Sequence, residues 1–76
     1  MTISAARLEV FMERMAAVTQ SAIFEAGGAT VDAVIQAVNE GMDQEERFSP
    51  EEVQKGLEEM NNKELIMLAG KVVYSV

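Results

Sequence analysis

Apolar residues recur at three- and four-residue spacings along the first third of the chain, which is the pattern of an amphipathic helix. Ser4 lies where a helix N-cap would stand, and the Gly27–Gly28 pair follows as a stop, because glycine readily takes the left-handed conformation that ends helices. The spacing predicts a helix over about residues 4–24, and an earlier end near Gln20 with an irregular tail stays open. The inward stripe of this helix consists of Leu8, Phe11, Met12, Met15, Val18 and Ala22.

A shorter apolar pattern after the glycines predicts a strand and then a second helix. We expect the strand at residues 29–31 and the helix at residues 32–42, with Asp32 as its N-cap. Residues 43–48 are mostly polar and are expected to form a loop. The inward stripe of the second helix consists of Val34, Ile35, Val38 and Met42.

The third helix, expected at residues 49–62, has the most clearly marked start in the chain. Ser49 is the expected N-cap, Pro50 takes the first helical position, where its missing N–H costs nothing, and Glu52 completes a capping box. The inward stripe of this helix consists of Val53, Leu57 and Met60.

The end of the chain is rich in β-branched and apolar residues and predicts two strands, at residues 64–69 and 71–76, around a short glycine-containing turn. Three helices packed on a small antiparallel sheet make a mainly α fold with a β hairpin, the winged-helix arrangement. We expect residues 1–76 to form one such domain. A plain three-helix bundle with a frayed tail is the alternative, because residues 65–68 also fit helical periodicity.

Charge restricts the possible partners. The chain carries 13 acidic and 6 basic side chains, for a formal net charge of −7. Duplex DNA is bound largely through lysine and arginine, and the basic residues here form no run, so we expect neither a nucleic-acid nor a membrane partner. An acidic domain of this kind either stays passive or meets a basic protein surface.

The sequence also argues against catalysis and against a cofactor in this domain. It has no histidine and no cysteine, which excludes a histidine base and a thiolate metal site. Gly70-Lys71 has no upstream glycine and no following serine or threonine, so it predicts a hairpin turn and not a phosphate-binding loop. The acidic side chains of residues 43–46 lack the spacing of a calcium loop and are interpreted as solvated.

From residue 48 to the end, the chain resembles the C-terminal winged-helix domain of the third subunit of the eukaryotic minichromosome maintenance helicase. Upstream, residues 31–49 are similar to that family's second helix and acidic loop, and residues 3–18 are similar, more loosely, to its first helix. Gly56 departs from the family pattern, where alanine is expected, and is interpreted as a close packing contact. The matching residues are Phe48, Ser49, Val53, Leu57, Met60, Asn61, Asn62, Ile66, Met67, Gly70, Val72 and Val73.

The resemblance implies a parent protein that is an ATP-dependent DNA helicase subunit of the nucleus, with its ATP and magnesium site elsewhere. It implies that this domain is a docking module for DNA replication licensing. The partners it implies are the origin recognition complex and its loading ATPase, with the other subunits of the helicase ring reached through the parent protein.

The third helix and the hairpin supply the candidate partner-binding residues. With the apolar stripe inward, the polar face of the third helix is expected to point mostly to solvent. The candidates are Glu51, Glu52, Lys55, Glu58, Glu59, Asn62, Lys71 and Tyr74. One alternative is a DNA-binding winged helix that uses Arg7, Arg14 and Lys71, and another is a passive structural domain.

Overall fold

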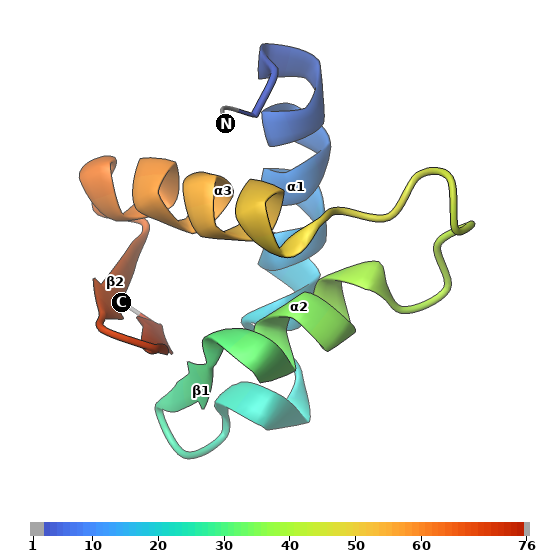
Figure 1. Cartoon of the computed structure of the whole chain (residues 1–76). Coiled ribbons are helices and arrows are strands. Elements are labelled where there is room, and N and C mark those ends of the chain that lie inside the picture. The colour runs from blue at the N-terminus through green and yellow to red at the C-terminus, as the bar shows by residue number, and fades with distance from the viewer. Residues whose placement is uncertain (1–2, 76) are drawn as a thin grey trace.

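Three helices surround one side of a three-stranded antiparallel sheet in a computed structural model that describes residues 3–75 (Figure 1). This architecture confirms the winged-helix prediction and excludes the three-helix bundle. The elements are α1 (Ala5–Val18), the 3₁₀ turn η1 (Ala22–Phe24), β1 (Gly28–Thr30), α2 (Val31–Asn39), α3 (Pro50–Asn62), β2 (Ile66–Ala69) and β3 (Val72–Ser75).

The sheet has the strand order β1-β3-β2, so the last strand lies in the middle. A two-residue turn joins β2 to β3, with Gly70 at a φ of +62°, a conformation that glycine adopts without steric cost. Because strand side chains alternate between faces, Ala29, Ile66 and Val73 turn inward together and are buried. The sheet therefore presents one face to the helices and leaves its other face outward.

The core lies where α1, α2, α3 and the inner face of the sheet meet. Phe11 of α1 is fully buried and its ring contacts the Phe48 ring edge to face, with centroids 5.4 Å apart. A Cβ built on Gly56 of α3 would lie 2.6 Å from two ring carbons of Phe11. The prediction that this glycine marks a close packing contact is confirmed, because a Cβ at this position would not fit without a shift of the Phe11 ring or of a helix.

The first helix ends at Val18, six residues before the predicted end at residue 24, and the alternative of an early end with an irregular tail is the correct one. The hydroxyl of Ser21 donates to the Val18 carbonyl, and the chain then turns into η1. At 100° per residue a continued helix would point residue 24 away from the Val18 face. The turn instead buries Phe24 and leaves Ala22 exposed, contrary to the predicted stripe.

The second helix also begins and ends earlier than the predicted range of 32–42. Thr30 is its N-cap, because the Thr30 hydroxyl accepts the Ala33 N–H, and the expected cap Asp32 lies in the first turn. The preceding strand is accordingly residues 28–30, one residue earlier than predicted. At the other end, the buried side chain of Asn39 donates to the Phe48 carbonyl and accepts the Phe48 N–H, which ties the end of α2 to the end of the following loop.

The third helix begins as predicted, with both hydrogen bonds of the capping box formed around Ser49 and Glu52. The turn that ends this helix includes residues 64 and 65, which were predicted to belong to the first strand of the hairpin. Glu64 takes a left-handed φ of +62°, and the N–H of Leu65 donates to the Met60 carbonyl, which closes the helix with a Schellman-type turn. The strand β2 therefore begins at Ile66, and β3 covers residues 72–75, while the predicted last residue, Val76, lies outside the described residues.

Candidate interaction surface

The start of α3 is tied to the start of α1 by a charged contact. The Arg7 guanidinium donates to both carboxylate oxygens of Glu52, at 3.0 Å to Oε2 and 2.9 Å to Oε1. It also lies 4.2 Å from the centre of the Phe48 ring. The hydrogen bond from Arg7 is the main reason why the pKa of the Glu52 carboxyl lies below its ordinary value.

Glu52 is therefore part of the scaffold, and the expectation that it points to solvent is wrong. Its side chain is only 20% exposed, and its carboxylate accepts the Ser49 N–H as well as the two bonds from Arg7. A sequence signal for this role existed, because Glu52 already occupied the third position of the capping box. No local sequence pattern indicates the pairing of Glu52 with Arg7, because the two residues are 45 positions apart in the sequence.

The rest of the polar face of α3 is open to solvent. Glu51, Lys55, Glu59 and Asn62 are exposed, and the Glu58 side chain is 44% exposed. Lys55 pairs with Glu58, three residues on, at 3.4 Å. The hydrogen bond from Gln54, followed by the charge of Lys55, holds the pKa of Glu58 below its ordinary value. No salt bridge forms at Glu51 or Glu59 within residues 3–75.

A shallow groove of about 440 Å³ runs between the beginning of α1 and this face of α3. Its apolar side is formed by half-buried Ile3 and Leu8. Its polar side brings together four of the eight candidate residues, Lys55, Glu58, Glu59 and Asn62. Glu51 lies one turn before Lys55 on the same helix, whereas Lys71 and Tyr74 belong to the hairpin and do not line the groove.

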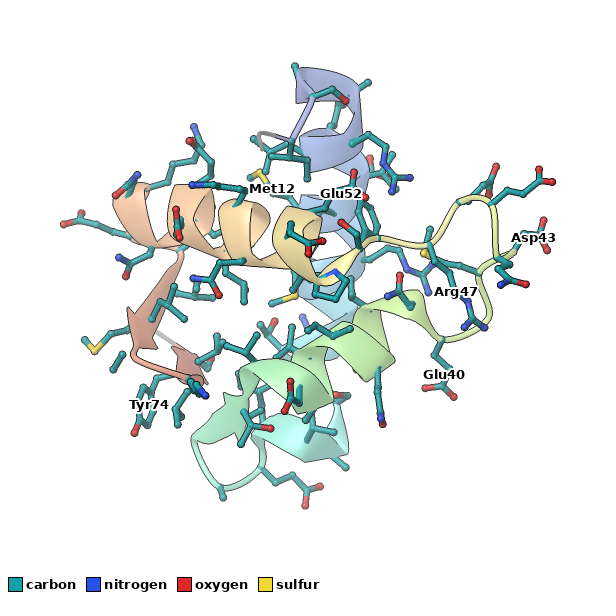
Figure 2. The ribbon with its side chains drawn as sticks, viewed as in Figure 1. Met12, Glu40, Asp43, Arg47, Glu52 and Tyr74 are labelled. Carbon is teal, nitrogen blue, oxygen red and sulfur yellow. The ribbon has the colours of Figure 1, made fainter. Side chains whose placement is uncertain are left out.

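Tyr74 stands on the outer face of the sheet, at the opposite side of the molecule from the loop that carries Asp43 (Figure 2). It pairs across the strands with Met67 on one side and with Gly28 on the other. Met67 is 57% exposed and Leu65 is 47% exposed, and the sequence did not indicate either of them as a partner-binding residue. The strand register is what exposes Met67, and the same register buries its neighbour Ile66.

Two of the three cations proposed for DNA contact are used inside the fold. Arg7 is held by Glu52, and it also donates to the backbone carbonyls of Glu46 and Arg47. Arg14 donates to the carbonyls of Val38 and Glu40 at the end of α2. Lys71 at the hairpin turn is exposed, but one lysine supplies little of the counterion release on which duplex binding depends.

The acidic side chains of the described residues form no metal-binding cluster. Within residues 3–75, no group of three histidine, cysteine, aspartate or glutamate side chains could hold a metal ion. Asp43 and Glu45 line an open hollow on the loop after α2. In the same part of the chain, no helix combines the length and the apolar character that a bilayer span requires.

Comparison with known proteins places the whole chain in one family. The family model described as "MCM3-like, winged helix domain" matches residues 1–76. The chain is 33% identical over 70 residues to the DNA replication licensing factor mcm3 of Schizosaccharomyces pombe (strain 972 / ATCC 24843). The match covers 92% of this chain and 8% of that relative, so the chain corresponds to a small part of the longer protein. No solved structure matches the chain.

Proposed function

The chain belongs to the family of MCM3-like winged-helix domains, and from this premise we propose that it is a non-catalytic docking module of a DNA replication licensing factor. The parent protein would be an ATP-dependent helicase subunit of the nucleus, with ATP and magnesium bound in another domain. This domain would engage the origin recognition complex and its loading ATPase, and would reach the other helicase subunits through its parent protein.

The observation that carries the proposal is which charges the structure leaves exposed. The arginines Arg7 and Arg14 are turned into the fold by hydrogen bonds, whereas α3 presents Glu51, Glu58 and Glu59 outward. A surface of this sign repels phosphates and attracts a basic protein surface, and it raises the association rate with such a partner. The helix that reads DNA in other winged-helix proteins is thus suited here to a protein contact.

Reversing charge on the groove tests this role. We expect the double substitution Glu58→Lys and Glu59→Lys to reduce capture of a reconstituted origin recognition complex with its loading ATPase, because both changes replace attraction by repulsion at exposed positions. The measurement is a pull-down with the domain as bait at two salt concentrations, and the loss should be larger at low salt.

The matched control is Glu25→Lys with Asp43→Lys, two exposed acidic residues away from α3 that change the net charge equally. Circular dichroism should be the same for all three proteins. Equal capture by the groove variant and the control variant would remove the α3 face from the proposal.

The DNA-binding alternative is tested by fluorescence anisotropy of the domain with labelled duplex at low salt. We expect no saturable binding, because the net charge is −7 and two of the three required cations are engaged internally. Tight association that weakens steeply with added salt would favour that alternative. If neither DNA nor the loading machinery is bound, the passive structural role is the one that remains.

A further inference from the structure

The outer face of the sheet carries no charge, although a quarter of the residues in this chain are charged. An antiparallel sheet with one solvated face normally places polar side chains on that face. Here two rows cross all three strands on the outward side, as the register of β1, β3 and β2 shows. The first row is Gly28, Tyr74 and Met67, and the second row is Thr30, Val72 and Ala69.

The first row carries the two large exposed apolar side chains of this face. Tyr74 is 42% exposed and Met67 is 57% exposed. The Tyr74 ring lies over Gly28, because a Cβ at that glycine would come within 2.8 Å of the ring carbon Cδ1. A glycine opposite an aromatic residue holds the ring in place, and an anchor that is already ordered loses little entropy when a partner binds. Leu65, 47% exposed, directly precedes β2 and stands two residues before Met67.

Recognition at this surface would use side chains and not an added strand. The backbone N–H of Leu68 in the edge strand β2 already donates to the side-chain oxygen of Asn61 at 3.1 Å. Asn61 at the end of α3 therefore takes up one of the backbone donors with which an extended peptide would pair at this edge. What remains open is the outer face itself, which is formed by Tyr74, Met67 and Leu65.

Charge decides which occupant suits this face. A second copy of the chain would bring two net charges of −7 together, and nucleic acid or an anionic membrane would likewise meet a surface of its own sign. The chain passes directly from the end of α3, at Asn62, to Leu65 and the strand β2. We propose that Leu65, Met67 and Tyr74 form the apolar anchor of a docking surface for a basic protein segment that presents apolar side chains, with the glutamates of α3 steering it into place.

This inference rests on the proposed function. It assigns partner binding to two separable contributions, the apolar anchor and the acidic face of α3. Apolar anchors contribute mainly to the lifetime of a complex, whereas exposed charges contribute mainly to its rate of formation. Tyrosine and methionine are both enriched in the buried centre of protein interfaces. The anchor should therefore matter at every salt concentration, and the acidic face should matter chiefly at low salt.

The test uses the 76-residue chain and a synthetic amphipathic peptide of leucine and lysine as the probe, followed by NMR. We expect amide shifts in β2 and β3, and we expect Met67→Ser to weaken binding about tenfold at both low and moderate salt. The control is Val10→Ser, which removes from α1 an apolar side chain that is as exposed as Tyr74 (42%) and should bind like the unaltered chain. A second variant, Tyr74→Ser, should reproduce the loss, and circular dichroism checks that each variant is folded.

Three results would overturn the inference. In the first, the peptide shifts only α1 and α3 and binds Met67→Ser unchanged. In the second, sedimentation shows a dimer of the chain that Met67→Ser dissociates, which would make a second copy the occupant. In the third, a peptide of lysine alone binds as tightly as the amphipathic peptide. The proposed function fails separately, when the α3 charge reversal leaves capture of the licensing machinery unaltered.

Discussion

At the scale of single residues, two glycines hold positions that no other residue could take without a shift of the surrounding structure. Gly56 lets the Phe11 ring lie directly against the backbone of α3, and Gly28 lets the Tyr74 ring lie on β1. The first contact sets how closely α1 and α3 approach, and the second holds the outward anchor of the sheet. Neither glycine is needed for its backbone angles, because neither has a positive φ.

We predict that Gly56→Ala lowers the free energy of unfolding by about 1 kcal/mol. Alanine favours a helix by about 1 kcal/mol over glycine, but the added methyl overpacks the contact with Phe11 at a cost of about 1–3 kcal/mol. Urea unfolding measures the difference. In a Phe11→Leu background the penalty should shrink or reverse, because the ring atoms at 2.6 Å are gone. A stabilising effect in the unaltered background would show that α1 moves away without cost.

At the scale of secondary-structure elements, capping interactions at the ends of the helices decide where each helix begins and ends. α3 begins at a complete capping box with Pro50 in its first turn and ends in a left-handed turn at Glu64. The N-caps of α1 and α2 are Ser4 and Thr30, whose hydroxyls each accept the N–H three residues on. Short helices such as these gain little from intrinsic propensity, so caps and packing decide where each one begins.

The cap of α3 gives a prediction at this scale. Ser49→Ala should lower the free energy of unfolding by about 1 kcal/mol, because the Glu52 N–H then loses its acceptor. Ser49→Asp keeps an acceptor at the cap and should retain most of the stability. Thermal unfolding followed by circular dichroism compares the two variants. An equal loss in both would mean that the hydroxyl has another role at this position.

At the scale of the whole molecule, the contact between Arg7 and Glu52 joins the beginning of the chain to the beginning of the third helix. The Arg7 and Glu52 side chains are 32% and 20% exposed, and the contact is bidentate. The pair is neutral as a whole, so it takes one arginine of α1 and one glutamate of α3 out of the charge that the surface presents. The outer face of the sheet carries no charged side chain in its two cross-strand rows.

This contact gives a prediction for pH. The pKa of Glu52 is lowered in the folded state, so its ionised carboxylate stabilises the fold above the unfolded pKa of about 4.5, and that stabilisation is lost as the pH falls through the lowered folded value. We expect the stability advantage of the unaltered chain over Glu52→Gln to be full at neutral pH and to shrink in acid. Urea unfolding across this pH range measures it, and an advantage independent of pH would contradict the assignment.

The sequence by itself determined the fold class, the order of the helices and hairpin, and the capped start of α3. These follow from signals within about four residues, such as a cap, a proline or an apolar stripe. It also carried the family resemblance, and it indicated that Gly56 marks a close contact.

Only the tertiary structure decided the end of α1, the internal use of Glu52, and the exposure of Met67 beside Tyr74 on the outer face. Phe24 enters the core only because the chain turns after Val18, and Glu52 meets an arginine 45 positions away. The face on which a strand residue lies depends on a register set by distant pairing, and a shift of one residue would exchange Ile66 with Met67. Contacts of this range leave no periodicity along the chain, so the sequence alone could not place them.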